Sequence, residues 1–295
     1  MTPAVTRAKG QAKPSPAIRW GRRALIAIGI LLTLLVIVLP LVAVFAQALS
    51  RGWEAYAANI THPETLHAIK LTLLAAAIAV PVNTIFGVCA AWAITRFRFP
   101  GRRLLQTLID IPFAISPVVA GVMYLLLYGT GGWLGAWLYA HDLQVMFSVT
   151  AVVLVTVFVT SPFVARELIP FMQAQGTEEE ESSMVLGASG WQTFWRVTLP
   201  NIQWALIYGV ILCNARAMGE FGAVAVVSGN IRGETNTLPL YVQQTFDDYN
   251  IAGAFAAASL LATLALFTLV LKTAVEWRRD RLAAVNDRRG SGEWN

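Results

Sequence analysis

The chain has 295 residues, of which 56% are hydrophobic and only 13% are charged. A soluble domain carries about a quarter charged residues, so this composition is too apolar for a surface that faces water, and the mean hydropathy of +0.59 agrees. The composition disfavours a soluble enzyme, a disordered chain and a disulfide-linked scaffold. The two cysteines, Cys89 and Cys213, both fall inside apolar runs, where a thiol behaves as a small hydrophobic group.

Six apolar segments are long enough to cross a membrane, since a helical span needs about 20 mostly apolar residues. A basic tail at 1–23 precedes the first of them, and this first run is longer than the roughly 7–15 residues of a secretory signal core. None of the six alternates with a period of two, and lipid offers backbone groups no outside partner, so we predict helices. The predicted spans are 24–46, 66–94, 106–128, 146–165, 203–227 and 251–273, followed by a C-terminal tail at 276–295.

Basic residues are distributed unevenly between the two sides of these spans. The N-terminal tail, the loops after the second and fourth spans and the C-terminal tail hold 18 of the 22 Lys and Arg residues, whereas the opposite side holds only Arg51, Arg232 and Lys70. Positive loops stay in the cytoplasm. We therefore predict an all-α, polytopic membrane helix bundle of six transmembrane helices with both termini cytoplasmic. The net charge of +5 then reflects loop topology rather than binding to nucleic acid.

The sequence lacks the motifs of a nucleotide-binding or metal-binding protein. There is no G-x-x-x-x-G-K-[ST] loop that could cradle phosphates. The three histidines are dispersed, and no Cys/His spacing is typical of a metal centre. We predict that this chain has no catalytic residue, no metal site and no cofactor of its own.

The loop between the fourth and fifth spans contains a predicted pair of short helices. Thr177 with Glu180, and Ser189 with Gln192, each fit a capping box at a helix start. Gly187 is placed to end the first helix in a backbone conformation that residues with a Cβ resist. An amphipathic helix on the membrane surface is one interpretation, but such helices carry basic polar faces, and this one opens with four glutamates. Docking into a groove of a partner protein is the favoured alternative.

The same segment resembles a known signature. Its spacing is similar to the E-A-A-x3-G-x9-I-x-L-P motif of the permeases of ABC importers, with serines in place of both alanines and Val197 in place of isoleucine. The resemblance covers about 60–275 and implies a type I (MetI-like) permease domain whose coupling helix, at about 177–190, docks into a separate ATPase. The residues that it implies at or near that contact are Glu181, Ser182, Ser183, Gly187, Leu199 and Pro200.

Other stretches resemble the sulfate and thiosulfate branch of this family. They are 110–121, 214–223, 228–233 and 237–240, and permeases for molybdate and tungstate share much of the pattern. The resemblance implies import of an oxyanion across the cytoplasmic (inner) membrane, without ATP hydrolysis by this chain. The partners that it implies are two ABC ATPase subunits, a second and paralogous permease subunit, and an external sulfate/thiosulfate-binding protein, all around a chain embedded in membrane lipid.

Arg216 and Glu220 lie four residues apart inside the fifth predicted span and so share one helix face. Charges at this depth are costly and usually face the protein interior or a pathway. Two interpretations stay open: a self-neutralising pair that holds helices together, or a pathway in which Glu220 tempers the charge of Arg216 so that an oxyanion can leave again.

Proline residues interrupt two of the predicted spans. Pro112 and Pro117 lie close to Asp110 near the cytoplasmic end of the third span, where a bend could shape an inner gate. A transporter driven by an ion gradient is the rival function. That class places discontinuous helices in two corresponding repeats, and the sequence offers no convincing internal repeat.

Overall fold

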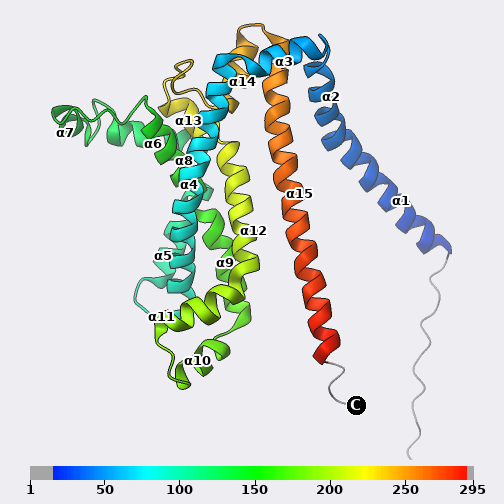
Figure 1. Ribbon diagram of the computed structural model, residues 1–295, viewed down its shortest axis with the longest axis vertical. Coiled ribbons are helices and arrows are strands. Elements are labelled where there is room, and N and C mark those ends of the chain that lie inside the picture. Colours follow the sequence, from blue (N-terminus) through cyan, green and yellow to red (C-terminus); the bar gives the residue numbers. More distant parts are fainter. Residues whose placement is uncertain (1–15, 291–295) are drawn as a thin grey trace, which may run out of the picture.

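The computed structural model describes residues 16–290, with side chains described over 21–278, and within these residues all regular secondary structure is helical (Figure 1). The predicted tails at 1–23 and 276–295 lie in part outside the described residues. The elements are α1 (Pro16–Thr33), η1 (Leu34–Val38), α2 (Leu39–Ala48), α3 (Trp53–Thr61), α4 (Pro63–Arg96), α5 (Arg102–Ala114), α6 (Pro117–Tyr128), α7 (Gly135–Ala140), α8 (Val149–Thr160), α9 (Pro162–Gln175), α10 (Glu178–Val185), α11 (Gly190–Thr193), η2 (Phe194–Thr198), α12 (Leu199–Met218), α13 (Gly222–Val227), α14 (Leu238–Asp247) and α15 (Ile251–Gly290).

Five helical segments of the described chain are long and apolar enough to cross a membrane, and a bent pair of helices adds a sixth if it counts as one span. An all-helical bundle is therefore confirmed. The count of six and the cytoplasmic position of both termini stay predictions. Figure 1 shows α4, α12 and α15 running along the long axis, with α10 and α11 near one end and α3 and α14 near the other.

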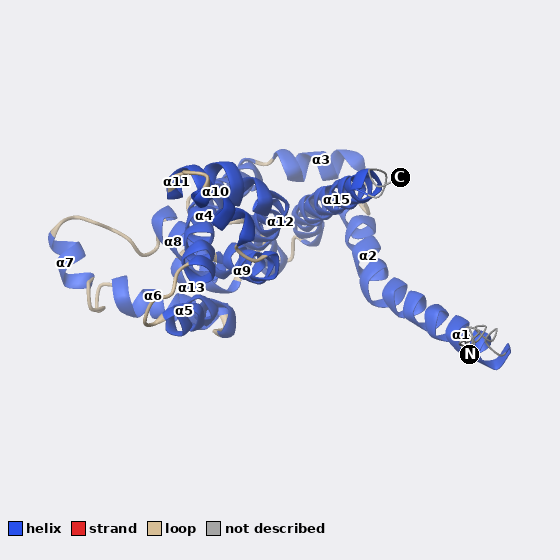
Figure 2. Ribbon diagram, turned by 90° about the horizontal axis from the view of Figure 1, so that it is seen from below, coloured by secondary structure: helices blue, strands red, loops and turns tan. Residues whose placement is uncertain are grey.

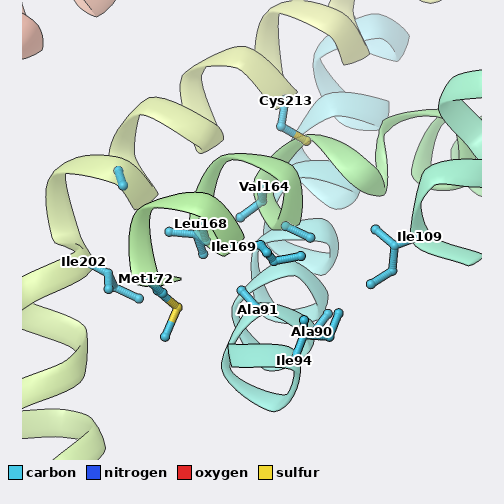
Figure 3. Close-up of a cluster of buried hydrophobic side chains, with 12 residues drawn as sticks. Ala90, Ala91, Ile94, Ile109, Val164, Leu168, Ile169, Met172, Ile202 and Cys213 are labelled. Atoms are coloured by element: carbon cyan, nitrogen blue, oxygen red, sulfur yellow. The ribbon is translucent and has the colours of Figure 1, made fainter. Parts of the chain in front are cut away.

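Helices α4, α9 and α12 form the centre of the bundle around small side chains. The buried positions of α4 recur every three or four residues and include Ala75, Ala76, Ala79, Gly87 and Ala91. In the apolar cluster of Figure 3, α4 packs on Val164, Leu168 and Met172 of α9 and on Ile202 of α12. Small residues let helix backbones approach closely where no hydrophobic effect drives association. This small-residue face of α4 is thus buried within its own chain.

The first apolar segment stands apart from this core. None of the most apolar window of Gly21–Ala48 is buried within the chain, and its mean hydropathy is 3.1. Figures 1 and 2 show α1 leading away from the bundle, while α2 lies beside α15. So apolar a helix with no cover from its own chain requires lipid or another apolar partner around it.

Two predicted spans are broken rather than continuous. The span predicted at 106–128 consists of α5 and α6, which meet at 107°. Proline has no backbone N–H and disfavours helical geometry in the residue before it, and the backbone turns at Ile115 and Ser116, directly before Pro117. Pro112 lies inside α5 without ending it. The span predicted at 203–227 stops at Met218 and resumes as α13.

The two breaks lie against each other. A Cβ on Gly222, the first residue of α13, would lie 3.2 Å from Cβ of Pro117, the first residue of α6. Further along the same pair of helices, a Cβ on Gly121 would lie 2.8 Å from Cβ of Val226. The half-helices α6 and α13 therefore pack closely from their first turns, and their glycines permit this approach.

In the contact between α4 and α9, Gly87 leaves no room for an added methyl group. Its missing Cβ would lie 2.6 Å from Cβ of Val164 and 2.9 Å from the backbone nitrogen of Ala165. We expect Gly87→Ala to lower the free energy of unfolding by about 1–3 kcal/mol, because overpacking forces the two helices apart. The control is Gly29→Ala in α1, where no atom lies within 4 Å. Thermal unfolding of the two variants in detergent should differ, and equal midpoints would refute the close α4–α9 contact.

Candidate functional site

The segment from α10 to the start of α12 folds as a compact turn of short helices at one end of the bundle (Figure 1). Gly187 has φ +91°, and its N–H donates to the carbonyl of Met184 at 3.0 Å. The predicted end of the first helix is thereby confirmed. The capping box of Ser189 and Gln192 is also confirmed, with reciprocal hydrogen bonds of 3.3 and 2.9 Å.

The capping box predicted for Thr177 and Glu180 is wrong. The Thr177 hydroxyl instead donates to the carboxylate of Glu181 at 2.6 Å. Glu180 turns inward, where its carboxylate lies 2.6 Å from Nε of Arg96 and accepts a hydrogen bond of 2.8 Å from Thr198. A buried guanidinium and a hydroxyl bind a carboxylate more strongly than one free backbone N–H does. The local pattern fits a cap, but the tertiary partner decides the rotamer.

The outer face of this segment is apolar at its tip and acidic at its base. Val185 and Leu186 are each 88% exposed, and Met184, Trp191 and Trp195 are more than half exposed. A surface groove runs along this face and is lined by Glu178, Glu181, Ser182, Val185 and Leu186. Large apolar side chains that stay in water beside polar ones mark a site of protein–protein contact.

The residues of the signature divide between this face and the interior. Glu181, Ser182 and Gly187 are exposed. Ser183 turns inward, 2.8 Å from the hydroxyl of Thr193 and 2.9 Å from the carbonyl of Glu180. Leu199 packs on the apolar cluster, and Pro200 follows it as an exposed residue in the first turn of α12; neither lines the groove.

A second set of charges lies at the break after α12. Nη1 of Arg216 lies 2.6 Å from Oε2 of Glu220, so the predicted common face is confirmed. The other oxygen of Glu220 accepts a 3.0 Å hydrogen bond from the N–H of Ala223 and thereby caps α13. The Glu220 side chain is 1% exposed, whereas that of Arg216 is 31% exposed. The carboxylate is therefore a fixed structural group, and the guanidinium keeps an open side.

Asp110 has a partner that the sequence did not suggest. Its carboxylate lies 3.6 Å from Nη1 of Arg166, whose guanidinium also stands 4.3 Å above the ring centre of Phe113. The sequence places Arg166 in the loop after the fourth span, which is wrong: it lies inside α9, in the apolar segment Val149–Gln175. The helix continues beyond the predicted limit of 165 because Pro162 occupies its first turn, where proline is tolerated.

The structure brings the candidate residues into separate groups. Pro117 lies against Gly222 beside the break that Glu220 caps, whereas Asp110 is held by α9. Arg96, Thr198 and Arg166 are the residues that sequence reasoning missed. Arg96 and Arg166 lie at the ends of apolar runs, and only tertiary packing shows which acidic residue each one pairs with. No group of three His, Cys, Asp or Glu side chains suited to a metal ion occurs among the described residues.

An apolar helix bundle with internal ion pairs and an exposed apolar surface at one end is typical of a polytopic membrane transport protein. The family described as "Binding-protein-dependent transport system inner membrane component" matches residues 83–281, and the chain belongs to this family. It is the transmembrane part of an ABC transporter, in which separate subunits hydrolyse ATP.

Several relatives carry more specific names. The chain is 58% identical over 261 residues, 88% of this chain and 90% of the relative, to "Sulfate transport system permease protein CysW" of Escherichia coli (strain K12). It is 39% identical over 239 residues, 80% of this chain and 86% of the relative, to "Sulfate transport system permease protein CysT" of the same strain. A solved bacterial alginate ABC transporter, in complex with an alginate-bound periplasmic protein, contains a chain with a TM-score of 0.72. That match covers 89% of this chain and 96% of the other at 17% identity, and it shows a shared fold.

Proposed function

We propose that this chain is the membrane-spanning permease subunit of an ATP-driven importer of sulfate and thiosulfate. The observation that carries the proposal is the 58% identity to a sulfate permease over 90% of that relative's length. The matched region covers 88% of this chain. The molybdate and tungstate permeases, which share part of the pattern, are the alternative within the family.

The proposal assigns the face from Glu178 to Leu186 to an ABC ATPase subunit. Its apolar tip and acidic base suit a groove in a partner better than an anionic lipid surface, which would repel the three exposed glutamates. Two ATPase subunits would serve a pair of permeases. This assignment requires the segment, and with it both termini, to lie on the cytoplasmic side of the inner membrane, as the distribution of basic residues predicts.

A second permease and a binding protein complete the proposed assembly. The most apolar window of Gly21–Ala48, which its own chain leaves unburied, requires lipid or an apolar neighbour, and the similarity to both CysW and CysT permeases supports a paralogous second subunit. The related alginate transporter was solved with its periplasmic binding protein. By analogy, an external protein would deliver the anion to the end of the bundle opposite α10.

Arg216 is the proposed contact of the anion within the pathway. Its guanidinium is charged, partly open and positioned by a carboxylate that is itself fixed at the start of α13. A lone arginine in low-dielectric surroundings would hold an oxyanion too tightly, whereas conduction needs binding that is readily released. Glu220 reduces the net charge of the site and so weakens anion binding.

The source of energy and the substrate are tested together in membrane vesicles that contain the full importer. We expect uptake of labelled sulfate to require ATP and the binding protein and to persist when ion gradients are collapsed. An excess of unlabelled thiosulfate should compete, and molybdate should compete poorly. Uptake that follows an ion gradient without ATP would favour the secondary-transporter alternative, and stronger competition by molybdate would reassign the substrate.

Gly187→Leu tests the docking face. The left-handed backbone at φ +91° resists a residue with a Cβ, and a bulky side chain would occupy the surface next to Leu186. We expect the variant to insert normally but to lose the co-purifying ATPase. The matched control is Gly101→Leu, which has φ +89° and, like Gly187, no atom within 4 Å of its missing Cβ. Normal ATPase yield with Gly187→Leu would contradict the docking assignment.

Arg216→Gln tests the pathway. We expect uptake per assembled complex to fall by at least about tenfold, because a neutral amide loses the charge-assisted hydrogen bonds that attract the anion. The variant also leaves the buried Glu220 without its cation, so the amount of assembled complex is measured in parallel. Arg51→Gln, an exposed arginine between α2 and α3, serves as the control. Uptake near the wild-type rate in an intact Arg216→Gln complex would reduce this pair to a structural role.

A further inference from the structure

The four glutamates that open α10 do not share one environment. Glu178, Glu179 and Glu181 are exposed, whereas Glu180 is only 9% exposed. Three of the charges therefore remain hydrated on the outer face. The fourth is withdrawn from water, which costs free energy unless every oxygen finds a partner.

Both carboxylate oxygens of Glu180 are paired with groups from other elements. Oε2 lies 2.6 Å from Nε of Arg96, the last residue of α4, and Oε1 accepts the hydroxyl of Thr198, the last residue of η2. Arg96 in turn donates from Nη1 to the carbonyl of Met172 in α9 at 3.1 Å. One ion pair thus connects α10 to α4, to α9 and to the segment that enters α12.

Arg96 lies against the buried apolar cluster formed by α4, α9 and α12. The Arg96 side chain is 8% exposed, and it follows Ile94, which is completely buried in the cluster of Figure 3. Met172, whose carbonyl it binds, is completely buried in the same cluster. One turn before Arg96, the ring of Trp92 contacts that of Phe194 at 4.9 Å. A displacement of Arg96 would therefore displace the ends of α4 and α9 together.

We propose that the Arg96–Glu180 pair is a positioning joint that transmits movement of α10 into α4, α9 and α12. The inference rests on the proposed docking of an ATPase on the opposite, exposed side of α10. The Arg96–Glu180 contact is a buried ion pair, and the Thr198 hydroxyl adds a charge-assisted hydrogen bond that fixes direction as well as distance. Apolar contact, by contrast, is non-directional and lets surfaces slide. The pair would make α10 move as one body with the bundle. Without it, α10 could move relative to α4, α9 and α12.

The first test is Glu180→Gln in the complete importer, reconstituted in liposomes with its ATPase subunits, second permease and binding protein. We expect the ATPase to co-purify at the wild-type level and ATP hydrolysis to continue. The amide keeps an acceptor for Thr198 but loses the negative charge that pairs with Arg96, so the ATP consumed per sulfate imported should rise by about tenfold. Glu276→Gln is the matched control, since it makes the same chemical change in an ion pair with Lys272 on α15, outside the docking face. Its ratio should equal that of the wild type.

A double variant separates transmission from stability. Replacing a buried ion pair with apolar residues of similar size often leaves stability unchanged, whereas removing one partner destabilises. Arg96→Met/Glu180→Met should therefore unfold at the wild-type temperature and retain the ATPase, yet still consume about tenfold more ATP per sulfate. If this double variant or Glu180→Gln consumed no more ATP per sulfate than the wild type, the proposed positioning role of the pair would be wrong. Failure of the wild-type chain to bind an ATPase would instead overturn the proposed function.

Discussion

Lipid supplies no hydrogen-bond partners, and this constraint governs every irregular feature of the bundle. A helix that breaks inside an apolar segment exposes backbone groups that only the protein can satisfy. After α12 the chain breaks at Gly219, and Glu220 supplies the missing acceptor for the N–H of Ala223. The same carboxylate needs a cation, because an unpaired charge would cost more than the break itself, and Arg216 provides it. The break, the cap and the ion pair therefore form one structural unit.

The same logic links the two ends of the structure. At the docking end, Glu180 joins α10 to α4 and α9 through Arg96; beside α13, Glu220 joins α12 to the following half-helix. Between them lie α4, α9 and α12, packed through alanines and glycines with little room to deform. A close-packed core transmits displacement rather than absorbing it. Helix α8 contacts α4 and α12 as well as α6 and α13, so it connects this core to the half-helices that meet beside Pro117 and Gly222.

Hydropathy and cap chemistry predicted the parts of this fold that depend on local sequence. The apolar segments, the turn at Gly187 and the box of Ser189 and Gln192 each follow from a few consecutive residues. Local sequence does not predict that Glu180 rather than Glu181 is the buried acid. Its partner Arg96 lies 84 positions away, and no neighbouring residue distinguishes the four glutamates. The 107° turn before Pro117 is a similar case: proline predicts a kink, but its angle is set by packing of α6 on α13.

The side chains of Arg216 and Glu220 differ in exposure, and this difference supports the proposed second permease. Glu220 is enclosed by its own chain, but Arg216 retains 31% of its side-chain surface, a state that an isolated bundle in lipid would not tolerate without water or another protein beside it. The apolar segment Gly21–Ala48 is uncovered in the same sense, since its own chain buries none of its most apolar window. A charged group that requires polar surroundings and an apolar helix that requires apolar ones make opposite demands. In the proposed assembly, a second permease that encloses an aqueous path beside Arg216, with lipid or the partner's own helices around Gly21–Ala48, would satisfy both.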